Sequence, residues 1–183
     1  MKEPLHWPVH ARKKAGHYRI FDVHEEECTS PRTSQKHHFF VIECASWVNA
    51  IALTHDEQIV LVRQYRHGIK KVTLELPGGI IDRVDEPPAE AAMRELREET
   101  GYIGKTARQL ASFYPNPAVQ QNVLHTVLVE GCVLSAETDF DEAEDIQTLL
   151  YPLSQIPEMI ASGEITHALN IAALYHYFRL SGK

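Results

Sequence analysis

The residues whose types and spacing could do chemistry in this chain are three closely spaced glutamates, Glu95, Glu98 and Glu99. In a helix they share one stripe of the surface, because positions three and four apart lie above one another. When solvated, such charges repel one another by only about a few tenths of a kcal/mol per pair. The stripe is therefore compatible with a charged outer helix face, and it would equally suit a bound cation.

The residues on either side predict the helix that would carry this stripe. Pro88 suits the first turn, where the missing backbone N–H of proline costs nothing, and Gly101 suits a left-handed cap at the end. Ala91, Ala92 and Leu96 supply apolar positions between them. The glutamates would thus lie on a helix that follows the Gly-Gly turn at Gly78 and Gly79.

The segment from Gly79 to Gly101, GIIDRVDEPPAEAAMRELREETG, resembles the Nudix box, G-x5-E-x7-R-E-U-x-E-E-x-G-U, where U is a bulky apolar residue. The residues that match in register are Glu86, Arg94, Glu95, Leu96, Glu98, Glu99, Gly101 and, more loosely, Tyr102. Six residues separate Gly79 from Glu86 where the pattern has five. This insertion leaves the conformation of the loop and the role of Glu86 open, while the helical carboxylates are unaffected.

The resemblance implies a metal site at the glutamate stripe. Two or three ions would be held against a diphosphate by Glu95, Glu98, Glu99 and the carbonyl of Gly78. Oxygen ligands without cysteine or histidine select Mg2+, with Mn2+ as the alternative. Arg94 stands four residues before Glu98, so a salt bridge between them can orient the carboxylates.

A second acidic segment, DFDEAEDI at residues 139–146, is a solvated loop if its position in the chain is ignored. In ADP-ribose pyrophosphatases, to which this chain is similar, the corresponding loop carries a general base and a further metal ligand. The local pattern assigns these roles to Glu142 and Glu144, with a shift onto Asp141 as the alternative. Glu142 and the metal ligand Glu98 are thus the predicted catalytic residues.

Substrate contacts are expected just upstream of the Gly-Gly turn, in VRQYR at residues 62–66. On a strand, Arg63 and Tyr65 face one side while Gln64 and Arg66 face the other. Arg66 is the preferred phosphate contact, because a guanidinium can hold phosphate oxygens bidentately; a surface pair with a glutamate is its alternative. Arg63 is a weaker candidate, and Trp47 is suited to stacking on a nucleobase or to buried packing.

The elements that must position these residues follow the order strands, helix, strands, helices. We expect strands at 47–53, 58–66 and 72–76 before the glutamate helix, strands at 108–113, 123–130 and 146–153 after it, and helices at 154–161 and 167–180. The expected fold class is α/β, and the resemblance implies the Nudix α/β/α sandwich with a mixed sheet. This domain would span residues 47–183.

Residues 1–46 are expected to form a separate β extension. The segments 18–26 and 38–44 read as the strands of a hairpin, with a turn-rich break around Pro31. Such a hairpin is too small to bury its own apolar face, which includes Phe39 and Val41. We therefore predict that the extension is a dimerisation element and that the protein is a homodimer.

Composition excludes several classes of protein. A formal net charge of −7 disfavours a nucleic-acid partner, and no run of 18 apolar residues could span a membrane. The first residues lack the apolar stretch of a signal peptide, which predicts a cytoplasmic protein. Cys28, Cys44 and Cys132 form neither a zinc pattern nor a disulfide framework.

The predicted function is metal-dependent hydrolysis of the pyrophosphate bond of nucleoside diphosphate sugars. ADP-ribose is favoured, giving AMP and ribose 5-phosphate, with ADP-glucose or GDP-mannose as further candidate substrates. Pro117, fifteen residues past Tyr102, is typical of the ADP-ribose group, although it would also simply rigidify a loop. The alternatives are an enzyme for another nucleoside diphosphate derivative, a non-catalytic nucleotide-sensing module and, more remotely, an isopentenyl diphosphate isomerase, for which no suitably placed cysteine is evident.

Overall fold

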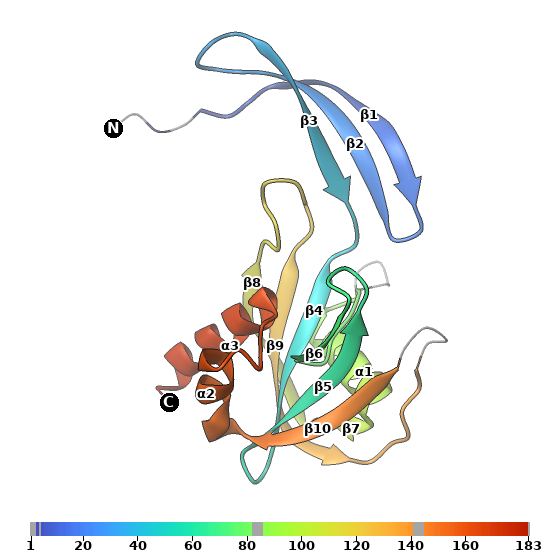
Figure 1. Ribbon diagram of the computed structural model, residues 1–183, viewed down its shortest axis with the longest axis vertical. Helices are drawn as coiled ribbons and strands as arrows, with labels where there is room; N and C mark the ends of the chain where they lie inside the picture. The colour runs from blue at the N-terminus through green and yellow to red at the C-terminus, as the bar shows by residue number, and fades with distance from the viewer. Residues whose placement is uncertain (1–2, 4, 82–85, 141–144, 183) are drawn as a thin grey trace. The chain divides into compact units, whose positions relative to one another are not determined.

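The computed structural model describes residues 3, 5–81, 86–140 and 145–182, and the chain divides into two compact units (Figure 1). The first unit consists of Met1–Ala45 and Tyr114–Val123, and the second consists of Ser46–Phe113 and Leu124–Lys183. Nothing in the sequence analysis assigned Tyr114–Val123 to the extension. In the structure this segment meets β3 through the backbone hydrogen bonds Ile42 N–H to Val119 O and Gln121 N–H to Ile42 O.

The first unit contains the expected N-terminal β extension, with one strand more than the predicted hairpin. Its antiparallel strands are β1 (Val9–Tyr18), β2 (Phe21–Thr29) and β3 (Lys36–Glu43), in that order across the sheet.

Cross-strand ion pairs add to the backbone ladder that joins β1 to β2. Lys13 pairs with Glu25 across the two strands at 2.8 Å, and Lys14 pairs with Asp22 at 2.5 Å. Opposite charges facing one another in this way stabilise an antiparallel pair. The side chains of β1 are almost all exposed, so these pairs and the backbone ladder, rather than apolar burial, are its contacts with β2.

The second unit is built on a mixed seven-stranded sheet with the order β10-β5-β4-β9-β7, in which β6 also pairs with β5 and β8 with β9. Strand β4 is parallel to β9, and the other pairs are antiparallel. The strands are β4 (Trp47–Thr54), β5 (Gln58–Arg66), β6 (Lys71–Glu75), β7 (Tyr102–Ile103), β8 (Thr106–Phe113), β9 (Leu124–Leu134) and β10 (Ile146–Pro152). The short strand β7 was not anticipated from the sequence.

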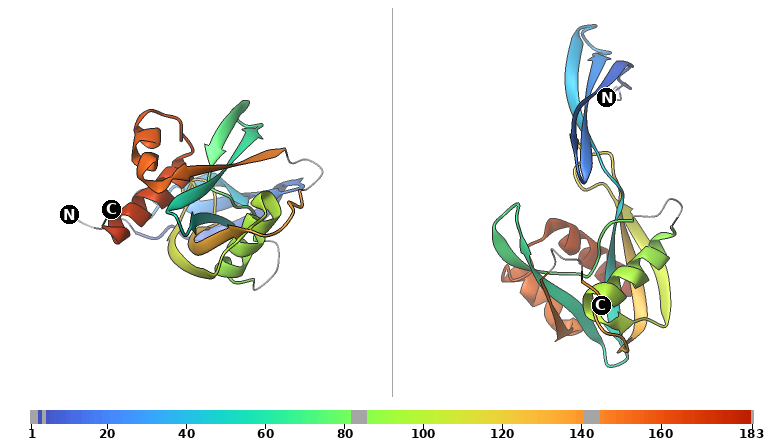
Figure 2. Two further views of the ribbon diagram at one scale, coloured as in Figure 1. Left: turned by 90° about the horizontal axis from the view of Figure 1, so that it is seen from below. Right: turned by 90° about the vertical axis from the view of Figure 1, so that its right-hand side faces the viewer.

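Helices cover both faces of this sheet (Figure 2, left). On one face lies α1 (Pro88–Thr100), and on the other lie α2 (Ile156–Ala161) and α3 (Ala168–Ser181). The beginning of the expected helix at 154–161 is instead a 3-10 turn, η1 (Leu153–Gln155). The expected α/β/α sandwich is confirmed.

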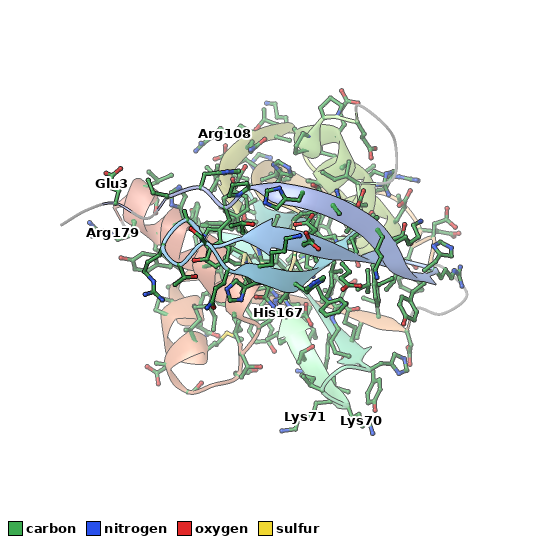
Figure 3. All side chains as sticks on the ribbon, turned by 90° about the horizontal axis from the view of Figure 1, so that it is seen from above. Glu3, Lys70, Lys71, Arg108, His167 and Arg179 are labelled. Atoms are coloured by element: carbon green, nitrogen blue, oxygen red, sulfur yellow. The ribbon has the colours of Figure 1, made fainter. Side chains whose placement is uncertain are left out.

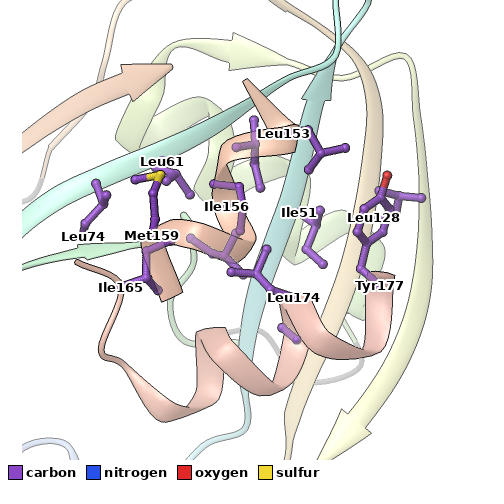
Figure 4. Packing of buried hydrophobic residues seen from close by; sticks show 13 residues of the cluster. Ile51, Leu61, Leu74, Leu128, Leu153, Ile156, Met159, Ile165, Leu174 and Tyr177 are labelled. Carbon is purple, nitrogen blue, oxygen red and sulfur yellow. The ribbon is translucent and has the colours of Figure 1, made fainter. Parts of the chain in front are cut away.

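Two hydrophobic clusters fill the sandwich, because alternate residues of β4 and β5 point to opposite faces. Ile51 and Leu61 meet α2 and α3, where Ile156 and Leu174 pack against them (Figure 4). On the other face, small residues such as Ala50 and Ala52 allow the buried Ala91, Ala92 and Leu96 of α1 to approach the sheet closely.

Strands β4 and β5 are paired at Ala52↔Val60 and Leu53↔Ile59, close to the turn that joins them. From there β4 continues alongside β9, while β5 continues between β6 and β10. The two strands therefore diverge within the sheet. The residues with candidate chemistry lie at this diverging end.

Candidate active site

Helix α1 begins and ends where the sequence predicts. Pro88 is its first residue, and Gly101 caps it in the left-handed conformation with φ 73°. The Gly101 N–H donates to the carbonyl of Arg97 at 2.9 Å. A side chain at Gly101 would also collide with the carbonyl of Ala136, so both the backbone angle and the available space require glycine.

Arg94 gathers the carboxylates of the Nudix-like segment around one guanidinium. Its Nη1 donates to Glu95 at 2.8 Å and to Glu98 at 3.0 Å, which confirms the expected salt bridge. Its Nε and Nη2 donate to Glu86 at 3.2 and 3.3 Å. Hydrogen bonding to Glu86, and then the charge of Glu95, raises the pKa of Arg94, so this residue is a permanent cation among the acids.

Glu99 is tied to the Gly-Gly turn instead. It is only 4% exposed and accepts a hydrogen bond from the Gly78 N–H at 2.9 Å. Glycine is required sterically at Gly78, because a Cβ there would collide with the backbone carbonyl of Val48, whereas a Cβ at Gly79 would displace the flexible end of the Glu95 side chain. The turn thus lies against the backbone of β4 and contacts the carboxylates of α1.

A cavity of about 320 Å³, called here the acidic cavity, lies between this turn, α1 and β5. Its lining residues are Gln64, Arg66, Gly78, Gly79, Ile80, Arg94, Glu95, Glu98, Glu99 and Asp139. The structure therefore brings together the predicted metal ligands Gly78, Glu95, Glu98 and Glu99 and the predicted phosphate contact Arg66.

A second cavity of about 430 Å³, called here the Trp47 cavity, shares Arg66, Gly78, Gly79 and Ile80 with the first. Its walls include apolar and aromatic side chains, namely Trp47, Ile69, Leu124 and Leu169. His167, labelled in Figure 3, and Asn170 line it from the start of α3. The adjoining cavities combine an acidic compartment with one suited to an apolar ring.

The donor set of the acidic cavity fits a hard divalent cation, because three carboxylates converge beside backbone groups of the Gly-Gly turn. Within the described ranges, no three His, Cys, Asp or Glu side chains are grouped as a finished metal site. The Arg94 guanidinium lies between Glu95 and Glu98 and supplies their counter-charge.

The predicted substrate-binding residues differ in their placement. Arg66 lines both cavities, and it also makes the glutamate pair that was its alternative, with Glu75. Trp47 is partly buried and lines the second cavity. Arg63 does not line either cavity; its Nη1 lies 3.5 Å from the side-chain oxygen of Gln147.

Glu142 and Glu144, the predicted base and further metal ligand, lie outside the described residues. The chain on either side of them borders the acidic cavity. Asp139 lines it, and the Asp139 N–H donates to the carbonyl of Glu98 at 2.9 Å. On the other side, Ile146 pairs with Gln64, which also lines the cavity.

The sequence analysis missed three residues of this region, Glu75, His167 and Asn170. Glu75 could have been noticed, because a glutamate in the strand just before the Pro-Gly-Gly turn has no place in an ordinary apolar strand. His167 and Asn170 carry no comparable signal, since α3 reaches the site only through the tertiary fold.

A family model described as NUDIX domain matches residues 46–170. The chain belongs to the Nudix family. This Nudix hydrolase is 26% identical to the ADP-ribose pyrophosphatase of Bacillus subtilis (strain 168), over 86% of this chain and 85% of that protein. It is 32% identical to the ADP-ribose pyrophosphatase of Mycobacterium tuberculosis, over 73% and 65% of the two chains. The predicted resemblance to this group of Nudix hydrolases is confirmed.

Two further similarities bear on this Nudix hydrolase. It is 28% identical to the methanol dehydrogenase activator of Bacillus methanolicus, over 84% of this chain and 82% of that protein. A solved structure titled "Crystal structure of ADP compounds hydrolase" superposes with a TM-score of 0.85 at 20% identity, covering 100% of this chain and 99% of the other, which shows the shared fold.

Among the described residues, no helix has the length and apolarity needed to cross a membrane.

Proposed function

We propose that this Nudix hydrolase cleaves the diphosphate bond of nucleoside diphosphate sugars in a reaction that depends on Mg2+, or alternatively Mn2+. ADP-ribose is the leading substrate, giving AMP and ribose 5-phosphate, and ADP-glucose and GDP-mannose are further substrates. The observation that carries the proposal is the pair of adjoining cavities. One gathers three carboxylates beside the Gly-Gly turn, the other has apolar walls, and Arg66 borders both.

In this proposal, Glu95, Glu98 and Glu99, with the carbonyl of Gly78, hold two or three divalent ions. Such ions, when bound, neutralise charge on the phosphate oxygens and favour attack by water at neutral pH. Glu99 is already fixed by the Gly78 N–H, so it needs the least movement to serve as a ligand. Arg94 positions the other two carboxylates, acting on the substrate only through them.

Glu142 is proposed to accept the proton of the attacking water, and Glu144 to act as an additional metal ligand. The support comes from the residues that flank them, Asp139 and Ile146, because both border the acidic cavity directly or through a strand partner. This neighbourhood is why we assign the base and the additional ligand to this segment.

Arg66 is proposed to bind a phosphate of the substrate, and Trp47 to contact its ring system from the larger cavity. The volume of about 430 Å³ lies within the range of small-molecule sites. Arg63 is the weaker proposed substrate contact, because it does not line either cavity.

The N-terminal β extension, residues 1–46, is proposed to mediate a homodimer. Phe39 and Phe40 remain 43% and 56% exposed, and Tyr18 is 54% exposed, so the unit has apolar surface for a second copy to cover. Size-exclusion chromatography with light scattering should give twice the chain mass of 20.8 kDa. A mass near 20.8 kDa would rule out the dimer.

The activity is tested by incubating the protein with ADP-ribose, ADP-glucose and GDP-mannose at millimolar Mg2+ and measuring nucleoside monophosphate. Glu99→Gln should abolish turnover and retain the fold, because glutamine still accepts the Gly78 hydrogen bond. Glu90→Gln, an exposed position on the same helix, is the matched control and should retain activity. Absence of product from all three substrates contradicts the proposal, and ADP-ribose binding without hydrolysis would favour a sensing module.

A further inference from the structure

A carboxylate outside the Nudix box, that of Glu75, is buried beneath the rim shared by the two cavities. Glu75 is only 2% exposed, whereas the side chain of its partner Arg66 is 44% exposed. Arg66 Nε donates to Glu75 Oε1 at 2.8 Å, and Arg66 Nη2 donates to Oε2 at 2.7 Å. The buried Glu75 carboxylate thus binds one edge of the Arg66 guanidinium, while the Arg66 side chain is partly exposed.

Further donors complete the environment of this carboxylate. Thr73 Oγ1 donates to Oε1 at 2.5 Å, and Asn170 Nδ2 lies 3.5 Å from Oε2. Each oxygen of Glu75 therefore has two donors directed at it. The protein itself uses the acceptor capacity of Glu75, which makes this residue unsuited to act as a metal ligand or as a general base.

Charge balance keeps the pair together. Burial would raise the pKa of Glu75, but the hydrogen bonds from Arg66 and Thr73 outweigh it and hold the pKa below its usual range. The carboxylate therefore stays ionised, and it can stay ionised in the interior only while a cation is paired with it.

Strand register shows what this pair does to Arg66. In the antiparallel β5–β6 pair, Arg66 lies opposite Lys71, while Glu75 lies four positions further along, opposite Val62. The Arg66 side chain must therefore fold back along the strand to reach Glu75. An arginine at a strand end without this partner would extend into solvent, where its rotamer entropy is larger.

We infer that Glu75 is a positioning residue: it holds the Arg66 guanidinium at the rim of both cavities. This inference rests on the proposed function, in which Arg66 binds a phosphate of the substrate. A guanidinium fixed before binding loses less entropy on contact with phosphate than a mobile one. The gain belongs to substrate binding, and the chemical step is unaffected.

The test is the kinetic effect of Glu75→Gln with ADP-ribose, which keeps the shape of the side chain and removes its charge. We expect KM to rise by about tenfold with kcat within about twofold, the pattern of lost uniform binding. Arg66→Lys should raise KM similarly, because an ammonium cannot make the bidentate contact. The double variant should then be no worse than the poorer single variant, since both changes remove one interaction.

The controls separate positioning from folding. Glu164→Gln, an exposed glutamate between α2 and α3, should leave both constants unchanged. Thr73→Val removes one hydrogen-bond donor from the Glu75 carboxylate and should raise KM by about two- to threefold. This variant also decides the matter if Glu75→Gln fails to fold, as judged by circular dichroism. An unchanged KM in the folded variant, or additive losses in the double variant, would overturn the inference.

A binding measurement separates this inference from the proposed function. Isothermal titration with inorganic pyrophosphate and Mg2+ needs no turnover, and Glu75→Gln should bind pyrophosphate about tenfold more weakly than the wild type. If the wild type hydrolyses none of the sugar substrates, the proposed function fails and pyrophosphate affinity alone judges Glu75. Equal affinity of wild type and variant would then refute its positioning role.

Discussion

Replacing Arg94 by methionine should lower the free energy of unfolding by about 2–4 kcal/mol. Arg94 is the shared counter-charge of Glu86, Glu95 and Glu98, whose side chains are 6%, 12% and 27% exposed. Removing one partner of a fully buried ion pair costs about 3–5 kcal/mol, and the partial exposure of Glu98 reduces that figure. Methionine retains most of the aliphatic stem, so the loss reports the charge and its hydrogen bonds.

Arg97→Met is the matched control, because it makes the same substitution three residues further along α1. Arg97 contacts only one carboxylate in this set, that of Glu98, at 3.4 Å, and its side chain is 45% exposed. Exposed pairs of this kind contribute about 0–1 kcal/mol. The difference between the two variants therefore isolates the buried charge cluster.

The assay is urea unfolding at neutral pH in the presence of a chelator, with circular dichroism as the measured signal. A loss of about 3 kcal/mol corresponds to a fall in melting temperature of roughly 6–12 °C for a chain of this size. Millimolar Mg2+ should narrow the gap between Arg94→Met and the wild type, because a bound cation replaces part of the missing charge. An Arg94→Met variant as stable as Arg97→Met would refute the reasoning.

Two further predictions concern the interior of the second unit. Burial raises the pKa of Cys132 to about 11 from 9.0, so the unfolded state loses its thiol proton first as pH rises. The wild type should therefore lose stability relative to Cys132→Ala between about pH 9 and 11, as urea midpoints would show; parallel midpoints across that range would contradict the prediction. Gly104→Ala should cost about 1–3 kcal/mol, because the added methyl collides with Val129 Cγ1, and Val129→Ala in the same chain should recover part of that loss. Purely additive thermal melts would exclude the collision.

The sequence predicts the helix of the site well, because its signals are local. Pro88 and Gly101 fix the two ends of α1, and the spacing of Glu95, Glu98 and Glu99 places their carboxylates on one side of it whatever the rest of the chain does. The strands with strong apolar content are also found, and β5 has the bounds expected for it, residues 58–66.

The missed elements depend on partners that are distant in sequence. Strand β1 has almost no buried side chain, so it lacks an apolar pattern, and its backbone and ion-pair partners lie on β2. Glu75 on β6 is contacted by Asn170, which stands 95 residues later in the chain. A pattern of periodicity within one segment contains no information about such pairs.

The Arg94 contacts also explain how the chain accommodates its additional residue before Glu86. Arg94 Nη2 donates to the carbonyl of Ile80 at 3.2 Å, and the same guanidinium holds Glu86. Both ends of the segment 80–86 are thus fastened to α1, so its length is uncoupled from the geometry of the glutamates. Lengthening a fastened loop from five residues to six costs only about 0.2 kcal/mol of closure entropy. The chain can therefore change in length between Ile80 and Glu86 while α1, which carries the three glutamates, stays as it is.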